Sequence, residues 1–272
     1  MPARPFARLL GVKCRPGPLV CRAHGTTGRG PRARPGRGPG DNGRTAVRAR
    51  EHATRTDPTT GWSLVVPLKP LRRAKSRLAP DADASQRPLL ALAFAQDTVA
   101  AALAAEGVRD VVVVTDDAEA GAAVAALGAL VVPDSPGAGL NAALAHGARA
   151  VALRRPGAPL AALNADLPAL RPAELARVLR RAAAFPRAFL PDAAGIGTTL
   201  LTAGPGADLR PAFGGHSRLR HAAGGAAEIP VAGVDSVRQD VDTAADLRAA
   251  SVLGLGPHTA RVYAALAPLL AP

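Results

Sequence analysis

Short apolar runs alternate with Ala- and Leu-rich stretches from residue 61 onward, and this alternation restricts the chain to a small set of folds. Val111–Val114 is a run of four valines, which is typical of a strand buried on both faces. Such strands belong to parallel sheets, in which a helix usually connects one strand to the next. The sequence therefore predicts an α/β domain with a mostly parallel sheet flanked by helices.

The apolar runs mark the expected strands, and the stretches between them mark the expected helices. We expect strands at Ser63–Val66, Asp110–Val114, Leu130–Val132, Leu160–Leu163 and Arg187–Leu190. We expect helices at Ser85–Ala105, Ala118–Leu127, Leu140–Leu153, Pro172–Ala184 and Thr243–Leu253. Hairpin-like pieces follow at Thr198–Thr202 and Glu228–Val231, so we expect a mixed sheet that is completed by a small β excursion.

Charge divides the chain into two parts. Residues 1–60 contain 13 Lys and Arg against three acidic residues, whereas the rest of the chain contains 21 against 18. The segment from Gly25 to Asn42 is mostly Gly, Arg and Pro, which cannot bury enough apolar surface to offset its ordering entropy. We therefore expect a disordered basic tail over residues 1–60 and one folded domain over residues 61–272.

The basic tail also bears on partners and compartment. Its clustered cations would attract nucleic acid, but aromatic residues are not interleaved with them, so we do not expect a nucleic-acid partner. Cys14 and Cys21 both lie in the tail, which leaves the expected domain without disulfides or thiolate metal sites. We find neither a convincing secretory signal nor a membrane span, and a cytoplasmic enzyme fits best.

The segment Asp240-Val241-Asp242-Thr243 places two carboxylates two residues apart. In an extended strand both would project from the same face, so they could share one divalent cation, and oxygen-only ligands favour Mg2+. The alternative is that the acidic cluster serves only the N-terminus of the next helix, because Thr243 and Asp246 have the spacing of a capping box. Spacing alone leaves both interpretations open.

Polar residues also follow three of the expected strands, where open α/β sheets bind their ligands. The loop from Pro67 to Leu78 has five cations and no acidic residue, which suits a triphosphate, although it lacks the P-loop pattern and a solvated loop is the alternative. Asp166 follows Leu160–Leu163 and is a candidate for a metal or a ribose hydroxyl, or else for a turn. Asp116 and Asp117 carry the same ambiguity.

Three glycine-containing segments are candidates for binding an anionic substrate. At Gly139-Leu140-Asn141, a glycine precedes an expected helix whose positive end would face anions, or the segment is simply a loop. Gly195–Thr199 and Phe213–Ser217 offer hydroxyls and exposed amides suited to a carboxylate or a phosphate. His216 and His221 invite an acid/base interpretation, but no spacing supports a hydrolase triad, so we expect His216 to be at most a polar lining residue.

Taken in this order, these segments resemble one family, the phosphoenolpyruvate and 2-phospho-L-lactate guanylyltransferases of coenzyme F-420 biosynthesis. The resemblance runs from about Trp62 to Tyr263. It implies a nucleotidyltransferase fold of the glycosyltransferase-A-like kind that binds GTP and Mg2+. It also implies three groups of site residues: metal ligands Asp166, Asp240 and Asp242; carboxylate-binding Thr198, Gly214 and Ser217; and phosphate-binding Lys69, Lys75 and Arg77. We expect Gly139 and Asn141 to bind substrate as well.

The implied reaction transfers GMP from GTP to the phosphate of a three-carbon acid and releases pyrophosphate. The Ala- and Arg-rich composition looks actinobacterial, and the resemblance then implies phosphoenolpyruvate as the acceptor. The product would be enolpyruvyl-diphospho-guanosine, which the next biosynthetic transferase would receive. The alternatives are 2-phospho-L-lactate as acceptor, or a molybdopterin guanylyltransferase, which carries a glycine-rich first loop that is absent here. Ile196 replaces the usual Thr between the glycines, and His216 replaces a common acidic residue, so we expect acceptor specificity to be affected.

Overall fold

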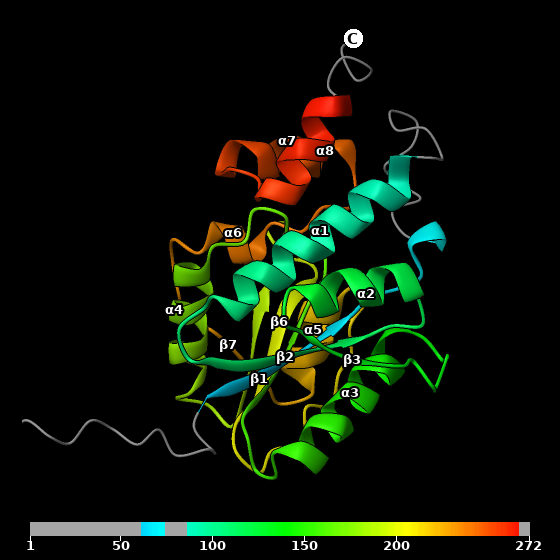
Figure 1. Cartoon of the computed structure of the whole chain (residues 1–272). Helices are drawn as coiled ribbons and strands as arrows, with labels where there is room; N and C mark the ends of the chain where they lie inside the picture. The colour runs from blue at the N-terminus through cyan, green and yellow to red at the C-terminus, as the bar shows by residue number, and fades with distance from the viewer. Residues whose placement is uncertain (1–60, 74–85, 267–272) are drawn as a thin grey trace, which may run out of the picture. The chain divides into compact units, whose positions relative to one another are not determined.

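The computed structural model describes residues 61–73 and 86–266, which form one seven-stranded sheet with helices on both faces (Figure 1). Residues 1–60, expected to form the basic tail, lie outside the described residues. Within the described part of the chain, no helix has both the length and the apolar character needed to cross a membrane.

The strands follow the order β3-β2-β1-β4-β6-β5-β7 across the sheet. Neighbouring strands are parallel, except that β6 runs antiparallel to both β4 and β5. The predicted mixed, mostly parallel sheet is therefore confirmed. The strands are β1 (Trp62–Pro67), β2 (Val108–Val114), β3 (Leu130–Val132), β4 (Leu160–Leu163), β5 (Arg187–Pro191), β6 (Thr198–Ala203) and β7 (Ala227–Glu228).

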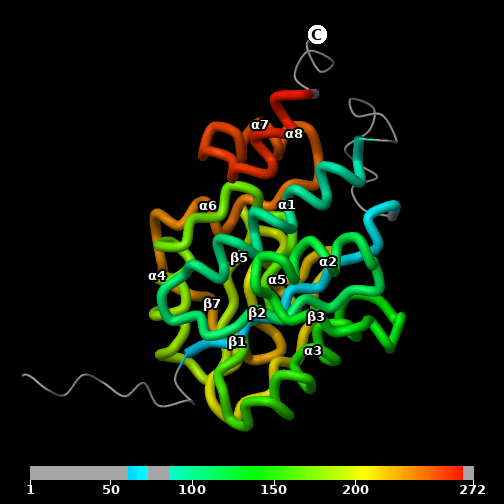
Figure 2. Tube along the Cα trace, viewed as in Figure 1, coloured from blue at the N-terminus to red at the C-terminus, as the bar shows by residue number. Residues whose placement is uncertain are grey.

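The helices connect these strands and continue beyond the last one, as the trace in Figure 2 shows. They are α1 (Gln86–Leu103), α2 (Ala118–Ala126), α3 (Leu140–Arg154), α4 (Pro172–Ala182), α5 (Ser217–Ala223), α6 (Asp235–Arg238), α7 (Ala244–Leu253) and α8 (Pro257–Leu266), with a 3-10 turn, η1, at Leu71–Arg73.

Alternate residues of the strands face two separate cores. Val111 and Val113 of β2 pack with α1, α2 and α4 on one face of the sheet, whereas Val112 and Val114 pack with α3 on the other. This arrangement explains the unbroken valine run, because both faces of β2 are covered. Helix α3 approaches the sheet closely at Gly147, where an added Cβ would lie 2.4 Å from Cγ1 of Val65.

The predicted elements of the parallel part are all present, with their ends within two residues of the predicted ones. The predicted strand at Thr198–Thr202 is present as β6, but it enters the main sheet between β4 and β5 rather than forming a separate excursion. The strand predicted at Glu228–Val231 is present only in part, since β7 covers Ala227–Glu228 and pairs in parallel with β5. Pro230 follows directly and has no N–H with which to extend that pairing.

Helices α5, α6 and α8 were not predicted. Helix α8 is fastened to α1 by Asp97, a buried aspartate whose carboxylate accepts the His258 and Thr259 N–H groups at 3.0 and 2.7 Å. Gly256 precedes α8, and an added Cβ there would lie 2.4 Å from the carboxylate carbon of Asp97. The start of α8 therefore depends on a partner about 160 residues earlier in the chain, which no local pattern indicates.

Candidate active site

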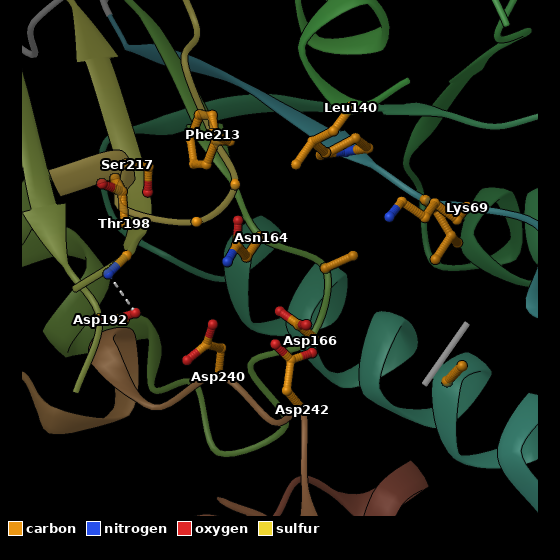
Figure 3. A pocket seen from close by; sticks show the side chains of 17 residues that line it. Lys69, Leu140, Asn164, Asp166, Asp192, Thr198, Phe213, Ser217, Asp240 and Asp242 are labelled. Carbon is orange, nitrogen blue, oxygen red and sulfur yellow. Dashed lines mark hydrogen bonds between the residues drawn. The ribbon is translucent and has the colours of Figure 1, made fainter. Parts of the chain in front are cut away.

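A cleft of about 530 Å³ opens at the edge of the sheet where β1 and β4 end. The chain builds β2 and β3 on one side of β1 and then places β4 on the other side. In α/β sheets, such a reversal of strand order leaves a crevice in which ligands bind. Lys69 reaches the cleft from the end of β1, and Asn164 and Asp166 reach it from the end of β4 (Figure 3).

The antiparallel strand β6 brings its first residues to the same edge. Leu200 pairs with Leu163 at the end of β4, and the Asn164 N–H donates to the Thr199 carbonyl at 3.0 Å. Because β6 runs in the opposite direction to β4, its first residue, Thr198, lies beside the last residues of β4. Thr198 therefore lines the cleft although it begins a strand.

The cleft contains the three aspartates that were predicted as metal ligands. Asp166, Asp240 and Asp242 all line it, and Figure 3 shows them gathered on one side. The Val241 N–H donates to the Asp166 carbonyl at 3.1 Å, and the Val241 side chain is buried. The expected extended strand is absent from this segment of the described chain, but Val241 anchors it, so the residues on either side both reach the cleft.

The predicted capping box of Thr243 and Asp246 is confirmed. Thr243 is the N-cap of α7 and forms a full capping box with Asp246. The Asp246 carboxylate also accepts the Asp242 N–H at 3.1 Å. Helix capping is thus performed by Asp246, while Asp240 and Asp242 line the cleft.

A buried threonine of α1 fixes the loop that carries Asp166. The Thr98 hydroxyl accepts the Leu167 N–H at 3.0 Å and lies 2.7 Å from the Phe94 carbonyl and 3.3 Å from the Ala165 carbonyl. These contacts hold the residues on both sides of Asp166. Thr98 was not predicted, because a lone threonine inside a helix gives no signal of a partner about 70 residues away.

Asn164 and the aspartates offer oxygen donors of the kind that Mg2+ prefers. Within residues 61–73 and 86–266, however, no three His, Cys, Asp or Glu side chains are placed so that they could hold a metal ion. Magnesium is usually bound by one or two carboxylates together with water and substrate phosphates, so this donor set fits an ion that a nucleotide would help to hold. The assignment of Asp166, Asp240 and Asp242 as metal ligands stays a prediction.

A fourth aspartate, Asp192, lines the cleft and shapes the turn between β5 and β6. Its carboxylate accepts the Ile196 N–H at 2.9 Å and the Gly197 N–H at 2.7 Å. A Cβ at Gly197 would lie 2.3 Å from Oδ2 of Asp192, so the turn requires glycine at this position. Asp192 was not predicted, although an aspartate shortly before a Gly-x-Gly segment is a usable turn signal.

The wall opposite Asp166, Asp240 and Asp242, which we call the neutral wall, is made of small residues and neutral hydrogen-bonding groups, and the Asp192 carboxylate next to it is bonded to the Ile196 and Gly197 N–H groups. Thr198, Gly214, Gly215 and Ser217 line it, and Figure 3 shows Thr198 and Ser217 side by side. The side chains of Thr198 and Ser217 are almost fully buried. Gly214 has a φ of 99°, a backbone conformation that favours glycine. The predicted carboxylate-binding residues are therefore brought together, and their role stays a prediction.

Gly139 and Asn141, predicted to bind substrate, are not among the residues that line the cleft, whereas Leu140 between them is. The Asn141 side chain instead clamps Phe213, since Oδ1 accepts the Phe213 N–H at 2.8 Å and Nδ2 donates to the Phe213 carbonyl at 3.2 Å. Asn141 therefore holds the segment that leads to Gly214. Its predicted contact with substrate stays a prediction.

Lys69 is the one predicted phosphate-binding residue that the structure describes, and it lines the cleft. Lys75 and Arg77 lie outside the described residues. The loop after β1 is held by Asp117, whose carboxylate accepts the Leu71 N–H at 2.9 Å. This bond holds the pKa of Asp117 below its ordinary value. Asp117 therefore acts as a turn and cap residue, which was one of its two predicted roles.

Two histidines lie near the neutral wall and differ in their environment. His216 is exposed, is not among the residues that line the cleft, and makes no side-chain capping bond to α5. His221 is buried, and burial, with the neighbouring cations Arg187 and Arg220, lowers its pKa to about 4. His221 is therefore neutral at physiological pH.

Comparison with known proteins places this arrangement in a family. Residues 85–223 match the MobA-like NTP transferase domain. A phosphoenolpyruvate guanylyltransferase from Streptomyces coelicolor is 70% identical over 205 residues, which cover 75% of this chain and 97% of that protein. Another phosphoenolpyruvate guanylyltransferase, from Thermomonospora curvata, is 56% identical over 78% of this chain and 92% of that protein.

Solved structures support the fold. A protein from Desulfovibrio desulfuricans G20 that is assigned as a nucleotide-diphospho-sugar transferase superposes with a TM-score of 0.58 at 16% identity, over 77% of this chain and 97% of that one. This likeness confirms the predicted nucleotidyltransferase fold. The identities to the guanylyltransferases in turn confirm the family that the sequence motifs resemble. The chain belongs to the phosphoenolpyruvate guanylyltransferase family of MobA-like NTP transferases.

Proposed function

We propose that this chain transfers GMP from GTP to the phosphate of phosphoenolpyruvate and releases pyrophosphate. The observation that carries the proposal is the division of one cleft into an aspartate wall and a neutral wall. The aspartate wall is formed by Asp166, Asp240 and Asp242, and the neutral wall by Thr198 and Ser217 together with Gly214 and Gly215. The names of the relatives support the choice of both substrates.

Charge supports a cation-assisted nucleotide site. Among the described residues that line the cleft, four are aspartates and Lys69 alone is basic. A triphosphate would be repelled by such a surface unless cations lay between the phosphates and the carboxylates. Asp166, Asp240 and Asp242 would hold Mg2+ together with the nucleotide phosphates rather than by themselves, and the bound ion would neutralise phosphate charge. Lys69 would contact the phosphates directly, and Lys75 and Arg77 are proposed to do the same.

The neutral wall suits the carboxylate of the acceptor. Hydroxyl groups of Thr198 and Ser217 can donate to a carboxylate, and the φ of Gly214 lets its backbone approach closely. Neutral donors bind the anion and add no charge that would compete with the nucleotide cations. An acceptor fixed by its carboxylate at this wall would direct its phosphate across the cleft toward the aspartates.

The reaction is then a displacement at the α-phosphorus of GTP. An oxygen of the acceptor phosphate forms a bond to the α-phosphorus, and the bond from that phosphorus to the bridging oxygen of the β-phosphate breaks. Pyrophosphate leaves with the electron pair, and the product is enolpyruvyl-diphospho-guanosine. The acceptor phosphate is largely deprotonated at neutral pH, so the step needs no general base. The chain contributes positioning and electrostatic stabilisation.

The remaining expectations are part of the same proposal. We infer that the enzyme acts in the cytoplasm and that the product passes to the next transferase of coenzyme F-420 biosynthesis. The basic tail over residues 1–60 is proposed to take no part in the reaction, so a chain that begins at Gly61 should keep its kcat and both KM values. Loss of turnover in that shorter chain would contradict this part of the proposal.

The direct test is a coupled pyrophosphate-release assay with GTP, Mg2+ and either phosphoenolpyruvate or 2-phospho-L-lactate. We expect the higher kcat/KM with phosphoenolpyruvate, and little turnover when ATP or CTP replaces GTP. A preference for 2-phospho-L-lactate would refute the proposed acceptor. Turnover with neither acid would refute the proposed function.

The same assay tests the aspartate wall. Asp240→Asn and Asp242→Asn should each lower kcat at least about a hundredfold, the scale of losing a charged group that stabilises a transition state. Asp235→Asn is a matched control, because Asp235 is exposed in α6 and does not line the cleft. Near-normal Mg2+-dependent turnover in the Asp240 and Asp242 variants would remove both residues from the site.

A further inference from the structure

His221 lies directly behind the neutral wall of the cleft. It is one helical turn after Ser217 on α5, and 1% of its surface is exposed. The centroid of its ring lies 5.0 Å from the ring centroid of Phe213, in an edge-to-face arrangement, and 5.9 Å from the ring centroid of Phe189. Both ring nitrogens have polar partners, since Nδ1 lies 3.0 Å from the Thr198 hydroxyl and Nε2 lies 3.0 Å from the Ala212 nitrogen.

The Ala212 contact determines which nitrogen carries the proton. A backbone N–H can only donate, so Nε2 of His221 must accept with its lone pair. A neutral imidazole with an unprotonated Nε2 has its proton on Nδ1. Nδ1–H therefore donates to the Thr198 oxygen. The buried ring stays neutral at physiological pH because its pKa is lowered by burial and by Arg187 and Arg220.

This bond determines the direction in which the Thr198 hydroxyl donates its proton. The Thr198 oxygen accepts from His221, so the hydroxyl proton does not point toward the ring. Thr198 lines the cleft at the start of β6, and its hydroxyl is left to donate into that space. Donation is what a carboxylate ligand requires, because an ionised carboxylate can only accept.

We propose that His221 is a positioning residue that holds Thr198 as a hydrogen-bond donor to the carboxylate of the acceptor. This inference rests on the proposed function, in which Thr198 receives that carboxylate. His221 itself does not touch the acceptor and transfers no proton. Its contribution is that it removes the alternative hydroxyl orientations of Thr198 before the acceptor arrives, so less orientational freedom is lost on binding.

Two substitutions separate the two ring contacts. His221→Gln places an amide near the position of Nε2, so it can keep the Ala212 bond while the bond to Thr198 is lost. His221→Asn places an amide near the position of Nδ1, so it can keep a donor to Thr198. We expect His221→Gln to raise the KM for phosphoenolpyruvate about tenfold, on the order of one lost buried hydrogen bond, and to leave the KM for GTP unchanged. His221→Asn should keep most of the affinity for phosphoenolpyruvate, and His146→Gln, on α3 and not among the residues that line the cleft, should change neither KM.

A double-mutant cycle tests whether His221 acts through Thr198. In a Thr198→Val background, His221→Gln should cause no further rise in the KM for phosphoenolpyruvate. An equal rise in that background, or a matching rise in the KM for GTP, would show a merely structural role and overturn the inference. Thermal unfolding of each variant identifies any substitution that fails to fold.

Nitrogen-15 NMR of the unsubstituted protein tests the tautomer without any substitution or turnover. At pH 7 we expect Nδ1 of His221 to be protonated and Nε2 to be unprotonated. Protonated Nε2 would overturn the inference even if all the kinetics agreed. If the enzyme preferred another phosphoacid, the proposed function would fail, but the tautomer and the coupling to Thr198, measured with that acid, would still decide the role of His221.

Discussion

Replacing Gly197 with alanine should disrupt the turn that presents Thr198 to the cleft. A Cβ at position 197 would lie 2.3 Å from Oδ2 and 3.2 Å from Cγ of Asp192, so the carboxylate would have to move. It would then give up its bonds to the Ile196 and Gly197 N–H groups. Hydrogen bonds to a charged group contribute about 1.5–3 kcal/mol each, and water can replace part of this because Asp192 is only half-buried. We therefore expect the free energy of unfolding to fall by about 2–3 kcal/mol.

A double-mutant cycle in urea unfolding separates the clash with the Asp192 carboxylate from any general effect of alanine on stability. Asp192→Ala alone should cost a similar amount, because it removes the same two bonds. In that background Gly197→Ala has no carboxylate to displace, and it should be neutral or should stabilise by about 0.4–1 kcal/mol through the unfolded chain. An equal cost of Gly197→Ala in both backgrounds would refute the proposed clash.

A second glycine provides the matched control. At Gly121 in α2, an added Cβ would lie 3.5 Å from Cγ1 of Val131 and 3.7 Å from Cγ2 of Thr115, which is ordinary contact. Gly121→Ala should therefore stabilise the protein by up to about 1 kcal/mol. Kinetics of Gly197→Ala complete the test. Because the displaced turn carries Thr198, the KM for phosphoenolpyruvate should rise more than the KM for GTP.

Other perturbations follow from the same contacts. Thr98→Val should lower the free energy of unfolding by about 1–3 kcal/mol, measured in urea, because the Leu167 N–H loses its buried acceptor, and kcat should fall with it. Because His221 is buried in its neutral form, only the unfolded chain binds a proton there as pH falls from 6.5 to about 4, and the free energy of unfolding should fall by up to about 3 kcal/mol over that range. His221→Asn should reduce this pH dependence in unfolding experiments. Ser217→Ala should weaken acceptor binding about tenfold without changing the KM for GTP, and an unchanged acceptor KM would remove Ser217 from the site. Removal of residues 1–60 should leave the melting temperature nearly unchanged, and a fall of several degrees would show that the tail stabilises the domain.

The parallel half of the sheet could be predicted from sequence because its signals are local. Each of these strands is an apolar run, and each is followed by a helix that begins close to where its own residues indicate, as at Pro172. The place of β6 in the sheet was less predictable. A strand that pairs with neighbours on both edges, as β6 does, can have the same sequence pattern as a strand that pairs only with its hairpin partner. Whether β6 joins the main sheet depends on its pairing with β4, which is a tertiary contact.

The site shows the same distinction between local and long-range signals. Asp240 and Asp242 could be found because their two-residue spacing is a local pattern. Asn141 was predicted as a substrate-binding residue from its local Gly-Leu-Asn segment, whereas its side-chain bonds to the backbone of Phe213 are long-range contacts that no local pattern indicates. Thr98 gave no usable signal, and His221 invited only an acid/base interpretation, because each contacts partners elsewhere in the chain.

Under the proposed function, the two walls of the cleft would impose a direction on the acceptor. Phosphoenolpyruvate carries a carboxylate and a phosphate, and either group would be repelled by Asp166, Asp240 and Asp242 in the absence of cations. The carboxylate has an alternative place among the neutral donors around Thr198 and Ser217, whereas the phosphate must reach the nucleotide to react. The separation of the walls thus sorts two anionic groups of one small molecule. Because 2-phospho-L-lactate carries the same two groups, this sorting cannot distinguish the acceptors, and their discrimination must come from shape around the carbon between the groups.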